Sequence, residues 1–246
     1  MKFLIQTIDG KVKHDFSFTL IQSLDYHNWI NNDKNAKYRL VNDLSKIKKP
    51  IYIPIGSVEF VSEYLQKFYD IIPKPLNVPN QLNQLKFTHR NIINGTEKDI
   101  VHHKFFKSND KIKGVSGVCS DIVIPNGNYQ ISDIIDILSE WRCFVFQGKL
   151  VGLSNYSGDF RIFPNIKKIE EMIKEYESAP IAYTLDVGID FDRNDDKHTF
   201  VIECHEFFSC GLYGFSDHKI LPIMFIRGFN EIVKKNLNLI KNNLVD

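Results

Sequence analysis

Several features that mark common classes of protein are missing from this sequence. The formal net charge is only +1, so charge gives no reason to expect nucleic acid or a membrane surface as the main partner. No apolar run approaches the ~20 residues that a membrane span needs. The apolar start, residues 1–5, is too short for a signal peptide. We therefore expect a cytoplasmic protein without nucleic-acid or membrane partners, of unknown oligomeric state.

Cysteine pairs of the CxxC type are also missing. The four cysteines, Cys119, Cys143, Cys204 and Cys210, have no framework spacing, so we expect reduced and mostly buried thiols. A zinc site built from Cys204, His205 and Cys210 is an alternative, but its spacing matches none of the common zinc patterns. The sequence has no Ser-His-Asp or Cys-His signature, which argues against nucleophilic catalysis by a side chain.

The composition is that of a protein with a real core. Hydrophobic residues make up 43% and charged residues 25% of the 246 residues, enough for one large domain or two small lobes that share a cleft. The apolar pattern predicts a hairpin over residues 1–20, turning at Asp9-Gly10. A polar helix or connection over 34–48 follows, and then a strand at 51–55 leading into a helix at 57–69 capped by Ser57.

Antiparallel strands dominate the pattern after the proline-rich stretch at residues 73–79, which marks a boundary or a cleft-lining loop. We expect strands at 101–106 and 115–124, a helix at 132–138, a hairpin over 141–153, an amphipathic helix at 166–176, strands at 182–190 and 199–205, and a C-terminal helix at 223–240. The predicted fold class is α+β with mainly antiparallel sheets after a small α/β opening.

The pair of strands near the C-terminus carries two acids. If they form a hairpin centred on Asn194-Asp195, Asp186 lies opposite Glu203 with both side chains on one face, shared with Val201 and His205. Directly opposed like charges destabilise a sheet. A cation that prefers oxygen ligands removes the conflict, and Mg²⁺ commonly takes one or two carboxylates plus substrate phosphates.

The alternative is that both acids point to solvent on a half-exposed hairpin. The flanking residues Thr199–Ile202 and Tyr183–Leu185 are apolar enough to favour strands covered on both faces. The pattern therefore predicts a metal site at Asp186 and Glu203, with His205 at its rim.

With these residues in hand, the chain resembles the ATP-grasp superfamily, in particular its compact R2K clade. In that superfamily an Asp on one strand and a Glu-x-Asn on the next hold magnesium on the phosphates of ATP. Leu185-Asp186-Val187-Gly188 and Ile202-Glu203-Cys204-His205 match these elements, except that His205 stands where Asn is usual. The resemblance covers roughly residues 85–230 and implies ATP and Mg²⁺ as cofactors.

The resemblance also implies roles for residues outside the acidic strands. Lys107, followed by Lys113-Gly114, resembles the strand lysine and flexible loop that contact the phosphates of ATP. Glu140 and Arg142 match the superfamily's Glu-x-Arg strand, whose Arg faces phosphate or acyl phosphate oxygens. Arg90 takes the place of another lysine.

Further candidates are less specific. Asp133 could accept a hydrogen bond from a ribose hydroxyl or could cap a helix. The segment Val123–Pro125 is a candidate for adenine contacts. Substrate-side candidates are Asn155, Tyr156, Arg161, Tyr213, Arg227 and the loop 211–214, for all of which packing is an equal explanation.

The resemblance implies a division into a pre-ATP-grasp-like α/β region, residues 1–98, and ATP-grasp-like catalytic lobes, residues 99–246, gripping a nucleotide. It implies a carboxylate–amine ligase that acts through an acyl phosphate on a small-molecule or peptide carboxylate and amine. Two alternatives remain open: a phosphotransferase on the same fold, and a non-catalytic nucleotide-binding or host-modifying protein.

Overall fold

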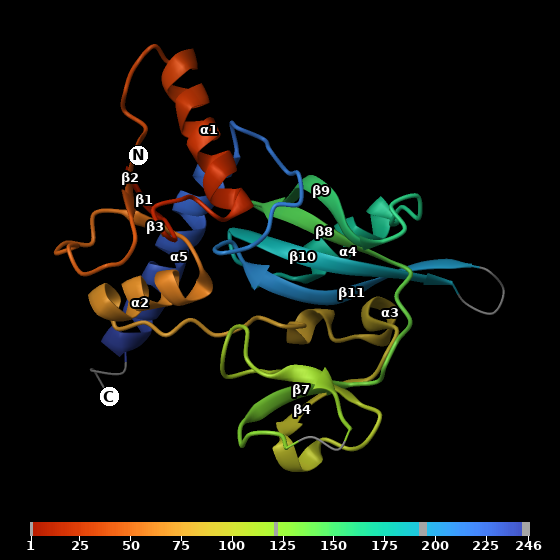
Figure 1. Cartoon of the computed structure of the whole chain (residues 1–246). Helices are drawn as coiled ribbons and strands as arrows, with labels where there is room; N and C mark the ends of the chain where they lie inside the picture. Colours follow the sequence, from red (N-terminus) through yellow and green to blue (C-terminus); the bar gives the residue numbers. More distant parts are fainter. Residues whose placement is uncertain (1, 121–122, 192–195, 243–246) are drawn as a thin grey trace. The chain divides into compact units, whose positions relative to one another are not determined.

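The computed structural model describes residues 2–120, 123–191 and 196–242, and divides the chain into two compact units (Figure 1). The first comprises residues 1–73, 180–182 and 207–246, and the second residues 74–179 and 183–206. The predicted α+β class is confirmed. The predicted division at residue 98 separates regions by their family resemblance, whereas the two units are defined by contacts within each. The predicted division therefore stays a prediction.

The first unit contains a parallel sheet in the order β2-β1-β3, formed by β1 (Lys2–Gln6), β2 (Lys37–Val41) and β3 (Ile53–Ile55). Its helices are α1 (Asp15–Ile30), α2 (Val58–Tyr69) and α5 (Leu221–Asn242), and α5 packs against α1, α2 and β3. The strand and helix expected at 51–69 are confirmed, and Ser57 caps α2 by accepting a hydrogen bond from the amide of Phe60 at 3.2 Å.

The hairpin predicted over residues 1–20 is wrong. Asp9 and Gly10 do form a turn, with Ile8 and Lys11 bridged across it, but β1 pairs in parallel with β2 and β3 instead. The chain then enters α1, where Phe16, Leu20 and Leu24 are buried. Their spacing of four is helical, and it outweighs the short alternation around Phe16 that suggested a strand.

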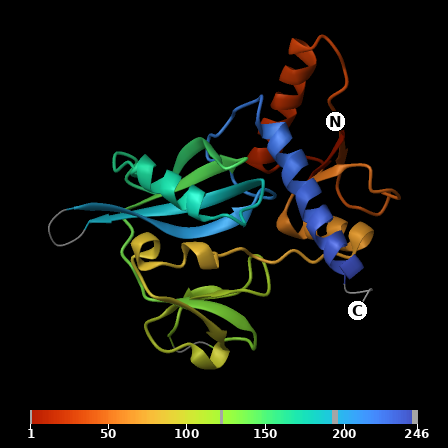
Figure 2. The same ribbon diagram turned by 180° about the vertical axis from the view of Figure 1, so that it is seen from behind.

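The second unit contains a four-stranded antiparallel sheet in the order β11-β10-β8-β9. The strands are β8 (Ser139–Phe146), β9 (Lys149–Gly158), β10 (Ala182–Phe191) and β11 (Lys197–Glu206), as the two predicted hairpins require. Helix α4 (Ile166–Glu175) lies across one face (Figure 2) and buries Ile169, Met172 and Ile173 against it. This helix was also predicted, and the interface forms the main core of the unit.

A smaller antiparallel sheet belongs to the same unit, in the order β4-β7-β5-β6. It consists of β4 (Ile92–Thr96), β5 (Phe105–Ser108), β6 (Ser116–Val118) and β7 (Asn128–Ser132). The short helix η2 (Glu97–Asp99) contacts β4, whereas α3 (Leu85–Thr88) contacts β11 of the larger sheet and η1 (Asn80–Leu82) contacts α4. Its core is built on Phe106, Cys119, Tyr129 and Ile131. The predicted strands at 101–106 and 115–124 are shorter and shifted, and Lys107 lies within β5.

The helix predicted at residues 132–138 is wrong. This segment is an irregular connection between β7 and β8. Asp133 does not cap a helix, because its carboxylate accepts two hydrogen bonds from Asn91, each at 3.1 Å, and contacts Lys104. The spacing of Ile134, Ile135 and Leu138 imitates a helical stripe, although no helix forms.

All four cysteines are free and buried, as expected. In the part of the chain that the structure describes, no helix is both long and apolar enough to cross a membrane.

Candidate functional site

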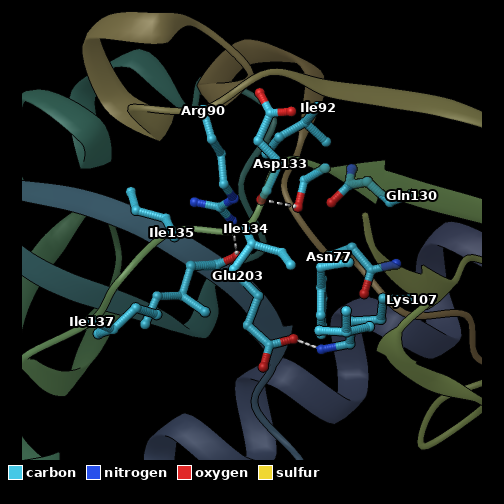
Figure 3. A pocket seen from close by; sticks show the side chains of 14 residues that line it. Asn77, Arg90, Ile92, Lys107, Gln130, Asp133, Ile134, Ile135, Ile137 and Glu203 are labelled. Carbon is cyan, nitrogen blue, oxygen red and sulfur yellow. Dashed lines mark hydrogen bonds and ion pairs between the residues drawn. The ribbon is translucent and has the colours of Figure 1, made fainter. Parts of the chain in front are cut away.

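A cavity of about 180 Å³ lies between the two sheets of the second unit (Figure 3). An apolar cavity of about 150 Å³ binds benzene, so this cavity has room for an aromatic ring. The lining comes from all four strands of the smaller sheet, from β11, from the connection after β7 and from the chain before β4. It consists of Asn77, Arg90, Ile92, Phe105, Lys107, Val118, Gln130, Ser132, Asp133, Ile134, Ile135, Ile137, Ile202 and Glu203.

Half of this lining is apolar. Ile134, Ile135 and Ile137 of the irregular connection line the cavity together with Phe105 and Val118 of the smaller sheet. Sequence reasoning missed the three isoleucines because it assigned them to a helix. Val123, the candidate for adenine contacts, is 97% exposed and does not line the cavity.

The two acidic residues pair across the neighbouring strands as predicted. Asp186 lies opposite Glu203 in the antiparallel pair of β10 and β11. The turn expected at Asn194-Asp195 lies outside the described residues. Asp186 is only 1% exposed, which rules out the alternative that it points to solvent.

A β-bulge follows directly. Asp186 pairs with Glu203 but Val187 pairs with Val201, so Ile202 is an extra residue in β11. The expectation that Val201 shares the face of Glu203 is therefore wrong: Val201 lies in the core with Val187 and Cys204. The bulge lets two consecutive residues, Ile202 and Glu203, both line the cavity, which regular alternation forbids.

Arg90 holds this bulge in place. Its guanidinium donates to the carbonyl of Val201 at 2.9 Å and to that of Ile202 at 3.2 Å, and also to the carbonyl of Thr88 at 3.1 Å. Burial lowers the pKa of Arg90 to about 10, so the side chain stays charged at neutral pH. Arg90 lines the cavity, as its predicted role in nucleotide binding requires.

Two ion pairs neutralise the acids, and Figure 3 shows the one between Lys107 and Glu203. Arg142 on β8 holds Asp186 with a two-pronged contact, Nε to Oδ1 at 2.8 Å and Nη2 to Oδ2 at 2.7 Å. Lys107 on β5 contacts Oε2 of Glu203, and the pair joins the smaller sheet to the larger one. A planar fork fits a carboxylate in this way, whereas lysine acts as a mobile point charge.

His205 completes the cluster. Its Nε2 lies 3.1 Å from Oε1 of Glu203 and 3.9 Å from Oδ2 of Asp186. Burial lowers the pKa of His205 to about 4 although Asp186 acts in the opposite direction, so the ring is neutral at pH 7. Burial, opposed by Asp186 and aided by Arg142, lowers the pKa of Lys107 to about 8.

These three side chains could hold a metal ion. One ligand atom each from Asp186, Glu203 and His205 can be chosen so that all lie within 4.8 Å of one another. Two carboxylates suit Mg²⁺. The sequence-predicted metal residues are thus brought together; their role as ligands stays a prediction.

The other predicted nucleotide contacts are less uniform. Asp133 lines the cavity, with its pKa lowered mainly by the hydrogen bond from Lys104. Lys113 is exposed in the loop between β5 and β6, and neither it nor Glu140 lines the cavity. Glu140 instead accepts a hydrogen bond at 2.8 Å from the hydroxyl of Tyr156.

Of the substrate-side candidates, Tyr156 is the one attached to the ion pairs. The Cζ atom of Arg142 lies 5.6 Å from the centre of its ring. The side-chain amide of Asn155 donates to the hydroxyl of Ser139 and to two backbone carbonyls, contacts typical of packing. Arg161 forms an ion pair with Asp159 on the surface. Tyr213, Arg227 and the loop 211–214 belong to the first unit, so their predicted roles stay predictions.

Asn77 lines the cavity and lies in the stretch 73–79 that the sequence offered as a boundary or cleft-lining loop, although the sequence did not single out this residue. Its carbonyl accepts from the amide of Cys204 at 2.7 Å, and its side chain donates to the carbonyl of Ser108 at 3.0 Å. Asn77 therefore links β11 to β5 through the residues that directly follow Glu203 and Lys107. The signal in the sequence was an asparagine within a proline-rich segment, because asparagine tolerates a positive φ, here 47°.

Comparison with solved structures identifies the fold. D-alanine–D-alanine ligase from Bacillus anthracis is matched with a TM-score of 0.50 and 13% identity, over 96% of this chain and 99% of the ligase. The same ligase complexed with ATP gives 0.49 and 15%, over 96% and 99%. A RimK domain ATP-grasp protein from Sphaerobacter thermophilus gives 0.49 and 10%, over 95% and 99%. A search of curated proteins finds no match.

The fold is therefore that of the ATP-grasp proteins, as the acidic strands suggested. A family model narrows this further: the ATP-grasp domain of R2K clade family 2 matches residues 87–223, more than half of the chain. The chain belongs to that family, which confirms the resemblance.

Proposed function

We propose that this protein is an ATP- and Mg²⁺-dependent ligase that joins a carboxylate to an amine through an acyl phosphate. The observation that carries the proposal is a cavity with a half-apolar lining that includes the ion pair of Glu203 and Lys107, next to the buried pair of Asp186 and Arg142. Membership of an ATP-grasp family supports it.

Different parts of the cavity lining suit the purine, the ribose and the phosphates of ATP. Ile134, Ile135 and Ile137 offer an apolar slot to the purine, and Asp133 offers an oxygen acceptor to a ribose hydroxyl. Lys107 lies further along, where it can exchange the carboxylate of Glu203 for a phosphate oxygen. Arg90 contributes indirectly, since it fixes the bulge that brings Ile202 and Glu203 to the cavity.

Asp186 and Glu203 would hold the metal. When bound, Mg²⁺ would neutralise the charge of the phosphates. Arg142 keeps Asp186 in one orientation through both carboxylate oxygens, and each oxygen retains a lone pair for a further partner. The residues present fit the ion.

The reaction has two steps and asks no side chain to form a covalent bond. An oxygen of the substrate carboxylate attacks the γ-phosphorus and ADP leaves. The amine nitrogen then attacks the acyl carbon, phosphate leaves, and the nitrogen loses a proton. Positioning and charge neutralisation by Lys107 and Arg142 carry the rate in such a mechanism. The acceptors we propose are small-molecule or peptide carboxylates and amines.

The test is ADP release with hydroxylamine as the amine, across a panel of carboxylates and carboxyl-terminal peptides. Formation of a hydroxamate with stoichiometric ADP supports the ligase, and Glu203→Gln should lower turnover more than 100-fold while the protein stays folded. An unchanged turnover in Glu203→Gln contradicts the proposal. ADP release with a phosphorylated product that is not an acyl phosphate indicates a phosphotransferase instead.

Nucleotide binding is measured separately by thermal unfolding with ATP and Mg²⁺. A ligand at ~100 times its dissociation constant stabilises the folded state by ~2.7 kcal/mol, a shift of about 5–10 °C for a chain of this size. A shift without turnover on any acceptor points to a non-catalytic binding protein.

A further inference from the structure

We propose that the metal site prefers a first-row transition ion over Mg²⁺, because Nε2 of His205 is one of its ligands. The inference deepens the function proposed above and rests on its metal site, but not on the ligase reaction. It concerns which divalent ion this chain selects when both are offered.

The spacing of the donor atoms matches neighbouring positions around one ion. Nε2 of His205 is 3.1 Å from Oε1 of Glu203 and 3.9 Å from Oδ2 of Asp186. Two ligands at bonds of about 2.1 Å lie about 3.0 Å apart at adjacent corners of an octahedron and about 3.4 Å apart in a tetrahedron. The first distance falls in this range, the second needs a closure of about 0.5–0.9 Å, and the carboxylates of Asp186 and Glu203 must close as well, because the three donors as a set lie within 4.8 Å of one another.

The positions of the donors are set by the sheet. Glu203 and His205 are two residues apart on β11, beyond the bulge, so they project from the same face. Asp186 comes from the neighbouring strand β10, where Arg142 fixes its orientation through both oxygens. All three donors thus stand on paired strands rather than on loops, which keeps their spacing defined.

The identity of the donors decides between ions. Mg²⁺ prefers oxygen ligands and loses its water reluctantly. Imidazole nitrogen suits transition ions such as Fe²⁺, Ni²⁺ and Zn²⁺, and affinity for such sites rises along the first row from manganese, so Mn²⁺ is the most stringent ion of the series to test. A site of two carboxylates and one imidazole therefore gains more from a transition ion than from Mg²⁺.

The neighbouring cations do not alter this comparison. Lys107 contacts Glu203 and Arg142 contacts Asp186, and both side chains repel any ion that enters. The repulsion depends on the charge of the ion, which is the same for Mg²⁺ and Mn²⁺. Lys107 and Arg142 thus weaken binding of both ions, while His205 alone discriminates between them.

The rival explanation is that His205 only hydrogen-bonds Glu203 and never binds the ion. His205→Asn separates the two explanations, because the amide keeps an oxygen for a metal and a polar group beside Glu203 but removes the nitrogen donor. His198→Asn is a matched control: His198 stands on the same strand but pairs across it with Asp190, away from the cluster.

The experiment uses the full chain with Mn²⁺ as the probe, with and without a non-hydrolysable ATP analogue. Pulsed electron paramagnetic resonance should detect a coordinated ¹⁴N nucleus in the wild type and in His198→Asn, and none in His205→Asn. Competition by Mg²⁺ gives the ratio of the Mg²⁺ and Mn²⁺ dissociation constants, which should fall at least tenfold in His205→Asn alone.

Bound Mn²⁺ without nitrogen coupling in the wild type, no Mn²⁺ binding at all, or an unchanged ratio in His205→Asn each overturns the inference. The wild-type spectrum decides even if His205→Asn fails to fold. Nitrogen coupling without any effect of the nucleotide analogue supports the inference while counting against the proposed ligase. Nucleotide-dependent Mn²⁺ binding without nitrogen coupling does the reverse.

Discussion

The pair formed by Arg142 and Asp186 should be among the most important polar contacts for the stability of the second unit. The two side chains are 9% and 2% exposed and share two hydrogen bonds at 2.7–2.8 Å. Hydrogen bonds to charged groups contribute about 1.5–3 kcal/mol each. Removing one partner of a buried pair costs about 3–5 kcal/mol, because the other charge is left without compensation.

Arg142→Met should therefore lower the free energy of unfolding by about 3 kcal/mol, the lower end of that range, since Lys107 partly compensates Asp186. Adding Asp186→Leu should recover much of the loss, because replacing both charges by apolar groups is often neutral. The double variant should thus be more stable than Arg142→Met alone, with a coupling free energy above about 1.5 kcal/mol.

Tryptophan fluorescence makes the measurement specific to one unit. The chain has two tryptophans, and Trp29 is 75% exposed on α1 of the first unit, whereas Trp141 is 7% exposed and adjacent to Arg142. A Trp29→Phe background leaves Trp141 as the reporter in urea titrations of the cycle. A loss below about 1 kcal/mol in Arg142→Met, or strictly additive single losses, would refute the reasoning.

Three further perturbations test the frame around the site. Gly158 has φ of +73° and an added Cβ would lie 2.2 Å from the carbonyl oxygen of Leu138, so Gly158→Ala should cost more than the ~1–3 kcal/mol of backbone strain. Gly148→Ala, at φ of +69° with nothing within 4 Å, should cost only that strain, by the same titration. Tyr156→Phe should lower the free energy of unfolding by about 1–2 kcal/mol, because it removes the hydrogen bond to Glu140. Tyr156→Leu should lower it by about 1 kcal/mol more, because it also removes the ring beside Arg142. Equal losses in the two variants would contradict this. Burial lowers the pKa of His89 from its usual 6.5, so protonation opposes folding and stability should fall as the pH drops below 6.5. His89→Gln should reduce that fall in urea titrations at pH 5 and pH 7, and identical falls in both proteins would show that His89 is not its source.

Sequence patterning predicted the pairing of Asp186 with Glu203 because both strands are long and apolar on their covered face, which leaves one register. It could not place the bulge at Ile202. This bulge is held by a residue distant in the sequence, the guanidinium of Arg90, and the sequence of β11 itself contains no signal that predicts the bulge. Val201 was assigned to the wrong face for that reason.

The connection after β7 shows a different limit. Ile134 and Ile135 have helical spacing with Ile131 and Leu138, yet Asp133 is bound to Asn91 and Lys104, and the chain stays irregular. Tertiary contacts overrode the local pattern, and the apolar side of the cavity was missed with them. Lys107 and Arg142 were found because the resemblance to a family indicated them, whereas spacing alone does not distinguish them from surface charges.

Arg90 and Asn77 should also limit the aggregation of this chain at high concentration. β11 is an edge strand, and an edge with free carbonyl and amide groups is a template for strand addition by another molecule. Arg90 occupies the carbonyls of Val201 and Ile202, and the carbonyl of Asn77 occupies the amide of Cys204. The residues that frame the cavity therefore also close the edge, so damage to the site and a tendency to aggregate should arise together.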